Sequence, residues 1–345
     1  FKNISAFISS LLIYFFILNI FTIFIFKSFL FQKKSFPRKF LRILPSPLRW
    51  QYPDLGTTFR SDDLALIGDS YVEGAGDAYT SNIYKYSIGH FLNDELNIPI
   101  VSYGAGGSSL PEQLELYKAS LEGELWPIRQ GREKINYPNN VILFFYEGND
   151  LLAYFKYRKR YNLSQKGYEE FRLNQLKRER YIPAYSVIKN LAYLSSKKIF
   201  SKFKNRSFSI KEVNEICIKE NCITTGPLQV AAPKYSKKEI SAAINSNLKS
   251  ILSFKKDYGR KICLVYIPSP GTIYPSEKIA FVPEKEFDLN IDFVSSKDNL
   301  SRSDFIKSSL SIELSKNDIK FIDLTPDLIE YAKNKLILGK KDIAH

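Results

Sequence analysis

Ser70 is the residue of this sequence best placed to act as a nucleophile. It ends the stretch LALIGDS, in which the apolar run Leu64–Ile67 predicts a strand, and helix-compatible sequence follows a few residues later. A serine just past the carboxyl end of a parallel strand lies where open α/β sheets bind their ligands. Gly68, Asp69 and Ser70 are also ordinary turn residues, so this tripeptide alone is more simply interpreted as a turn.

Three further stretches contain the other residue types that acyl transfer needs. A second predicted strand, Pro99–Tyr103, leads into the turn GAGG, and a third, Val141–Tyr146, leads into the turn EGND. The chain ends in DIAH, which places Asp342 three residues before His345. A serine hydroxyl is a weak nucleophile until a base takes its proton, and the base needs a third group to orient it. The order of these stretches therefore favours an acyl-transfer site.

The stretches GDSYVEG, SYGAGG, EGND and DIAH together resemble the four sequence blocks of the SGNH (GDSL-type) hydrolase family, in a membrane-anchored member. The resemblance runs from about residue 63 to residue 345 and matches poorly in the middle. It implies an α/β fold, namely a flavodoxin-like three-layer α/β/α domain with a parallel sheet. It also implies a serine hydrolase that needs no cofactor and no metal.

The resemblance assigns catalytic roles to three residues. Ser70 would be the nucleophile, His345 its general base, and Asp342 the group that orients the imidazole. The chain has only two histidines, and the other, His90, lies in a helix-like stretch where a structural role is the simpler interpretation.

The resemblance also implies an oxyanion hole. Its donors would be the Ser70 amide, the Gly107 amide and the side-chain amide of Asn149, with Gly104 as the second choice for the glycine. The sequence departs from the family pattern at two places. Glu147 stands where the third block usually has glycine, and Ser102 stands where the second block commonly has asparagine.

The remaining sequence alternates between predicted helices and strands, as a parallel sheet covered on both faces requires. Pro268–Asn299 is predicted to be a long surface loop. The predicted helices are 83–96, 111–122, 240–254, 303–314 and 326–335. The two further predicted strands are the one that contains Cys263 and the one at 320–323.

The N-terminal region is predicted to attach the protein to a membrane. Residues 7–26 contain no charge and are long enough to cross a bilayer as one helix. We expect residues 1–32 to be a transmembrane anchor, 33–60 a basic juxtamembrane linker and 61–345 the hydrolase-like domain. The positive-inside rule applied to the basic linker favours a cytoplasmic domain. The resemblance favours the opposite side, the periplasm or cell surface, and we adopt that expectation.

A basic helical insertion is expected at about residues 151–235. Its excess of lysine and arginine agrees with the net charge of +14 for the whole chain. It could be a solvated face, a seat on phospholipid headgroups or a groove for an anionic glycan. No recognition motif supports binding of nucleic acid. Cys217 and Cys222 within it could form a local disulfide or remain free thiols.

These observations predict a membrane-anchored serine esterase that cleaves an O-acyl ester, which we expect on a cell-envelope carbohydrate. One alternative is an acyltransferase that passes the acyl group to a glycan hydroxyl instead of water. Another is a non-catalytic envelope protein that binds glycan. The sequence does not define the oligomeric state.

Overall fold

The computed structural model describes the five-stranded core of the chain and several flanking segments. The residues described are 6, 7, 9–18, 20, 62–74, 88–104, 108–121, 138–152, 154, 155, 214–218, 221–225, 231–274, 278–281 and 292–333. All statements below concern these residues.

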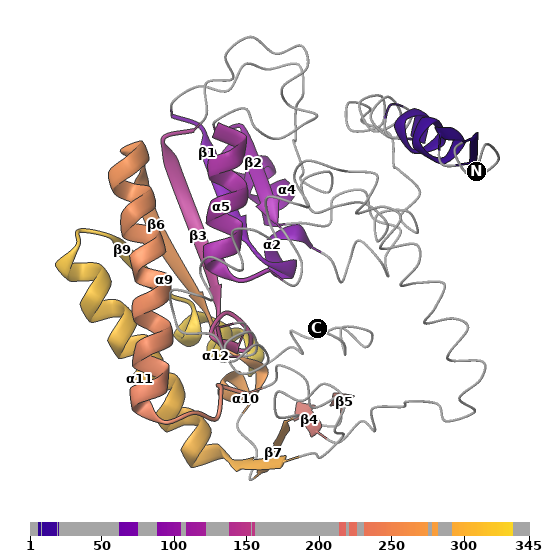
Figure 1. Ribbon diagram of the computed structural model, residues 1–345. Helices are drawn as coiled ribbons and strands as arrows, with labels where there is room; N and C mark the ends of the chain where they lie inside the picture. The colour runs from indigo at the N-terminus through magenta and orange to yellow at the C-terminus, as the bar shows by residue number, and fades with distance from the viewer. Residues whose placement is uncertain are drawn as a thin grey trace.

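The core is a parallel sheet of five strands (Figure 1). The strands are β1 (Leu64–Gly68), β2 (Ile100–Gly104), β3 (Asn140–Tyr146), β6 (Lys261–Ile267) and β9 (Lys320–Asp323). Their spatial order is β2-β1-β3-β6-β9, which is the doubly wound order of flavodoxin-like folds. The predicted parallel α/β architecture is confirmed, and each of the five predicted strands forms.

β3 lies at the centre of this sheet, between β1 and β6. Its sequence NVILFFY is almost wholly apolar, as expected for a strand that is covered on both faces. Seven residues of β3 pair in register with seven of β6, from Asn140 opposite Lys261 to Tyr146 opposite Ile267. Alternate side chains enter two separate apolar clusters, with Leu143 and Phe145 on one face and Phe144 and Tyr146 on the other.

Helices cover both faces of the sheet. One face packs against α5 (Leu110–Leu121), α9 (Lys237–Tyr258) and α11 (Ser296–Lys316), and in Figure 1 α5 and α9 lie in front of the strands. The opposite face packs against α2 (Ser70–Glu73) and α4 (Ile88–Leu96). The last helix described is α12 (Thr325–Ala332). The result is the predicted three-layer arrangement.

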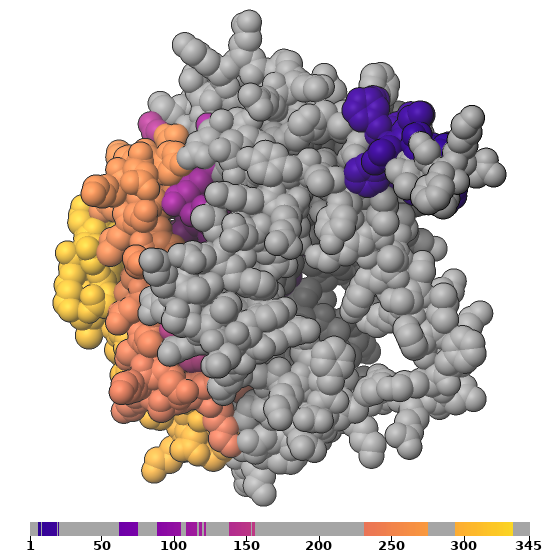
Figure 2. Space-filling model, viewed as in Figure 1, coloured from indigo at the N-terminus to yellow at the C-terminus, as the bar shows by residue number. Residues whose placement is uncertain are grey.

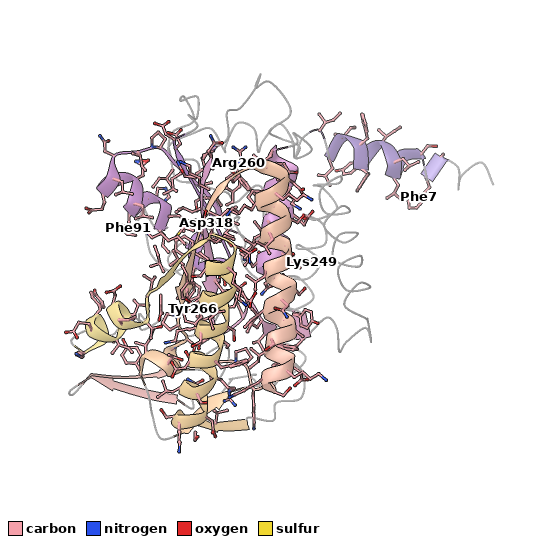
Figure 3. The ribbon with its side chains drawn as sticks, turned by 90° about the vertical axis from the view of Figure 1, so that its left-hand side faces the viewer. Phe7, Phe91, Lys249, Arg260, Tyr266 and Asp318 are labelled. Atoms are coloured by element: carbon pink, nitrogen blue, oxygen red, sulfur yellow. The ribbon has the colours of Figure 1, made fainter. Side chains whose placement is uncertain are left out.

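α9 shows how local sequence fixes an element of this fold. Ser236 caps its first turn in a capping box with Glu239, and Gly259 ends it in the left-handed conformation at φ 60°. Its apolar side chains face the core while its lysines remain outside, and Figure 2 shows this helix on the outer surface of the molecule. In Figure 3, Lys249 is labelled on α9, and the buried Tyr266 is labelled to the left of this helix.

The prediction of one long loop over Pro268–Asn299 is wrong. This range contains the short helix α10 (Pro270–Ile273), the strands β7 (Lys278–Phe281) and β8 (Asp292–Ser295), and the start of α11. β7 and β8 pair as an antiparallel ribbon. Ser295 caps α11 by accepting a hydrogen bond from the Asp298 amide, so the helix begins seven residues before the predicted Ser303.

Two regions flanking the core bear on the predicted domain organisation. Within the range expected to be a helical insertion, residues 214–218 (β4) and 221–225 (β5) form an antiparallel hairpin, which the sequence did not predict. The described residues between 6 and 20 are helical. No helix in the described part of the chain combines the length and apolarity needed to cross a bilayer.

Candidate active site

Ser70 is the first residue of α2, directly beyond the carboxyl end of β1. The backbone turns sharply here because Asp69 caps the helix: its Oδ1 accepts a hydrogen bond from the Tyr71 amide at 2.9 Å. Gly74 ends α2 after one turn in the left-handed conformation at φ 65°. Ser70 is 6% exposed, so the predicted nucleophile lies in a nearly desolvated position at the edge where an open α/β sheet binds ligands.

The short helix α2 is pressed against β2 by a glycine. A Cβ added to Gly104 would lie 2.1 Å from the Glu73 nitrogen, so a side chain at this position is sterically excluded. The Ser102 hydroxyl donates to the Val72 carbonyl oxygen at 3.1 Å. These two contacts fix the helix that begins with Ser70. Gly104, the second choice for the oxyanion hole, therefore has a clear packing role.

Asn149 lies beside the turn that carries Ser70. Its Nδ2 donates a hydrogen bond to Asp69 Oδ2 at 2.7 Å, although the two residues are 80 positions apart in sequence. An asparagine amide has two N–H groups, so this bond leaves one for another acceptor. The two oxygens of Asp69 thus bind separate partners, the Tyr71 amide and Asn149, and couple the position of Asn149 to the turn that carries Ser70.

The turn that carries Asn149 is closed by Asp150. The Asp150 carboxylate accepts a hydrogen bond from the Tyr146 amide at 2.6 Å, and the Asp150 amide donates to the Tyr146 carbonyl oxygen at 3.1 Å. The rings of Tyr146 and Tyr71 have their centroids 4.5 Å apart. This contact joins the last residue of β3 to the first turn of α2.

The electrostatic environment of this edge disfavours additional negative charge. Burial, and next the charge of Asp69, raise the pKa of Asp150 well above its usual range, while hydrogen bonds from the Tyr146 and Leu110 amides act in the opposite direction. Burial is also the largest cause that raises the pKa of Tyr146, followed by its interaction with Tyr71. A neutral donor such as Asn149 suits this environment, because its charge does not change with pH.

Three of the predicted site residues lie outside the described residues. They are Gly107, Asp342 and His345, and their roles stay predictions. His90 lies in α4, in agreement with the helix predicted there. In the described part of the chain, no group of three histidine, cysteine, aspartate or glutamate side chains could hold a metal ion.

Sequence reasoning missed two residues of this region. Asp69 was assigned no role beyond the turn, although it joins Ser70 and Asn149 through its two oxygens. Glu147 was noted only as a departure from a pattern, yet it is completely buried and hydrogen-bonded. Its position directly after an apolar strand was the available signal, since a carboxylate enters such a place only with partners.

Comparisons with known proteins found similarities among solved structures. No protein-family model matches the sequence, and no curated protein matches it significantly. Among solved structures, the chain is similar to AlinE4, an SGNH-hydrolase family esterase, and to a serine-to-alanine mutant of that esterase. Each superposes with a TM-score of 0.37 at 15% sequence identity, covering 84% of this chain and 88% of the other.

Proposed function

We propose that this chain is a serine esterase of the SGNH type that cleaves an O-acyl ester through an acyl-enzyme on Ser70. The observation that carries the proposal is the contact between the Asn149 side chain and Asp69, the residue before Ser70. Through this contact a neutral amide donor lies against the residue that precedes the buried Ser70, at the carboxyl edge of a parallel sheet. These are the groups that attack on an ester carbonyl requires.

In the proposed first step the Ser70 Oγ attacks the carbonyl carbon of the ester. The hydroxyl proton passes to the His345 imidazole, which Asp342 orients, and the carbonyl oxygen becomes an oxyanion. Asn149, Gly107 and the Ser70 amide donate hydrogen bonds to that oxyanion. Such donors contribute about 3 to 4 kcal/mol each in related chemistry, because they are already oriented before charge develops.

In the second half of the reaction the intermediate collapses and the alcohol leaves with the proton from His345. Water then attacks the acyl-enzyme while His345 takes its proton, and the acid is released from Ser70. Each cycle consumes one ester and one water and regenerates the free serine. No cofactor takes part in this scheme.

We further propose that the substrate is an acylated carbohydrate of the cell envelope and that residues 7–26 attach the protein to a membrane, with the catalytic domain extracytoplasmic. Large apolar side chains in the described part of this segment are exposed, and an apolar surface of this kind fits lipid. The exposed fraction is, for example, 66% for Phe7, 64% for Leu12 and 66% for Phe16. The basic linker that follows would lie on anionic headgroups.

The test of the proposed activity is hydrolysis of a short-chain aryl ester by the full chain in detergent. Ser70→Ala should lower the rate by at least about a thousandfold, since removing a catalytic nucleophile leaves only the contribution of binding and the oxyanion donors. Ser253→Ala is the matched control, because Ser253 is an exposed serine on α9. A fluorophosphonate should label the wild type and the control at Ser70, as read from the peptide mass, but not Ser70→Ala.

The outcome separates the proposed esterase from the other functions. A rate that Ser70→Ala retains would show that the nucleophile is another residue. Acyl transfer to an added glycan in preference to water would identify an acyltransferase that uses the same acyl-enzyme. Absence of both turnover and labelling, together with binding of an anionic glycan, would identify a binding protein.

A further inference from the structure

Glu147 opens the turn that carries Asn149 and is completely buried, with an exposed fraction of 0%. Its amide donates to the Ile267 carbonyl oxygen at 2.9 Å, which extends the pairing of β3 with β6 by one residue. Its Oε2 accepts hydrogen bonds from the Ser269 amide at 2.6 Å and from the Thr272 Oγ1 at 2.8 Å. Both backbone and side chain of Glu147 are therefore bound to the segment that follows β6.

The partners of Glu147 are themselves buried and hydrogen-bonded. Ser269 is the N-cap residue of α10 and Thr272 lies within this helix. Their hydroxyl oxygens lie 3.3 Å apart. Thr272 Oγ1 also accepts a hydrogen bond from Asn299 Nδ2 at 3.2 Å, and Asn299 Oδ1 accepts one from the Ala232 amide at 2.8 Å. The network thus joins the turn after β3 to α10, to α11 and to the segment before α9.

A cation on α11 also lies within the field of this carboxylate. Arg302 follows Asn299 by one helical turn. Burial lowers the pKa of Arg302, whereas the negative charges of Asp298 and Glu147 act in the opposite direction. A buried carboxylate is costly unless hydrogen bonds and charge compensate it. Both donors of Glu147 bind Oε2, whereas the buried Oε1 has no hydrogen-bond partner among the described residues.

We propose that Glu147 is a positioning residue, which anchors the turn Glu147–Asp150 to α10 and so fixes the direction in which Asn149 donates. Asp150 closes the same turn onto Tyr146, and Asp69 binds the Asn149 amide from the side of Ser70. Glu147 supplies the anchor from the side of α10. The inference rests on the proposed function, in which Asn149 stabilises the oxyanion.

The test is a double-mutant cycle between Glu147 and Asn149, measured with the full chain and a short-chain aryl ester. Glu147→Ala should lower kcat about tenfold and change KM less than twofold, because the effect is on the transition state. Glu147→Gln should restore kcat to within about threefold of the wild type, since an amide oxygen still accepts from Ser269 and Thr272. In an Asn149→Ala background, Glu147→Ala should change kcat less than twofold.

A purely structural role predicts a different pattern. Glu147→Ala would then lower kcat by the same factor with or without Asn149, and that result would overturn the inference. Circular dichroism and the unfolding midpoint in urea show whether each variant folds. If Glu147→Ala does not fold, Thr272→Val removes one of the two donors to Glu147 Oε2 and goes through the same cycle, with about a threefold loss of kcat expected.

A second measurement does not depend on turnover. The side-chain amide of Asn149 is assigned in a nitrogen-15 spectrum by its loss in Asn149→Ala. Glu147→Ala or Thr272→Val should shift or broaden that signal, and the Ser253→Ala control should leave it unchanged. An unchanged Asn149 signal in both variants overturns the positioning role. If the signal shifts in the variants but the wild type shows no Ser70-dependent turnover, the esterase is contradicted and the anchor by Glu147 stands.

Discussion

At the scale of single residues, Asp69 connects two parts of the candidate site. Its two oxygens separate two tasks: Oδ1 caps the helix that starts at Ser70, and Oδ2 binds Asn149. Hydrogen bonds to charged acceptors contribute about 1.5 to 3 kcal/mol each. One side chain therefore determines where both the nucleophile and the neutral donor lie.

Replacing Asp69 by asparagine should lower kcat for ester hydrolysis about tenfold with little change in KM. The two hydrogen bonds of Asp69 go to different oxygens, and asparagine replaces one of these oxygens by an NH2 group, which cannot accept. Steady-state kinetics of Asp69→Asn measure this. Asp62→Asn is the matched control, since Asp62 is an exposed carboxylate just before β1. An unchanged kcat in Asp69→Asn would show that the two hydrogen bonds of Asp69 do not position Ser70 and Asn149.

Asp150 should make the protein less stable as pH rises. Its pKa is raised in the folded state, so between its usual value of about 4 and the raised value the folded chain holds a proton that the unfolded chain has lost. In that range each increase in pH therefore favours the unfolded state. Relative to Asp150→Asn, the wild type should therefore lose free energy of unfolding from about pH 4 upward. Urea unfolding at a series of pH values measures this, and a constant difference at all pH values would contradict it.

At the scale of secondary-structure elements, the hairpin β4–β5 bears on the choice between disulfide and free thiols. Cys217 and Cys222 are direct partners in the antiparallel register. Residues directly opposite each other have Cα atoms about 4.5 to 5.5 Å apart, which lies within the range that disulfides span. The backbone register thus favours a cross-strand disulfide.

We expect the protein to form this disulfide when it is oxidised. Alkylation under denaturing conditions should then modify only Cys263 before reduction and all three cysteines after reduction, as read from the intact mass. The variant Cys217→Ser should expose two thiols in both states. Three modified cysteines in oxidised, unreduced wild-type protein would show that the pair stays free.

The sequence predicted some elements well, and the physical reasons differ from one element to another. β1, β3 and β9 were predictable because each is a short run rich in apolar residues and bounded by turn residues. β7 and β8 were missed because four-residue strands in a stretch with prolines and charges lack a readable period. The bond from Asn149 to Asp69 joins residues 80 positions apart, so it depends on the packed sheet and has no local signal.

At the scale of the whole molecule, we expect the proposed anchor to bind the membrane and the folded core to carry the activity without it. Deleting residues 1–32 should release the protein from lipid vesicles and leave kcat/KM for a soluble aryl ester within about twofold, because the five strands and their helices lie outside that range. Flotation of both proteins with anionic vesicles measures the first effect. A truncated protein that still floats with the vesicles would show that another surface binds lipid.

The position of β3 in the sheet has a consequence for biosynthesis. β3 pairs with β6, but the ribosome must translate the whole range from residue 147 to residue 260 before the partner strand begins at Lys261. Until then the nascent chain has an apolar strand with an unpaired edge, which can pair with other chains and aggregate. Ribosome pausing within that range should therefore increase the demand for chaperones far more than pausing after β6 has emerged.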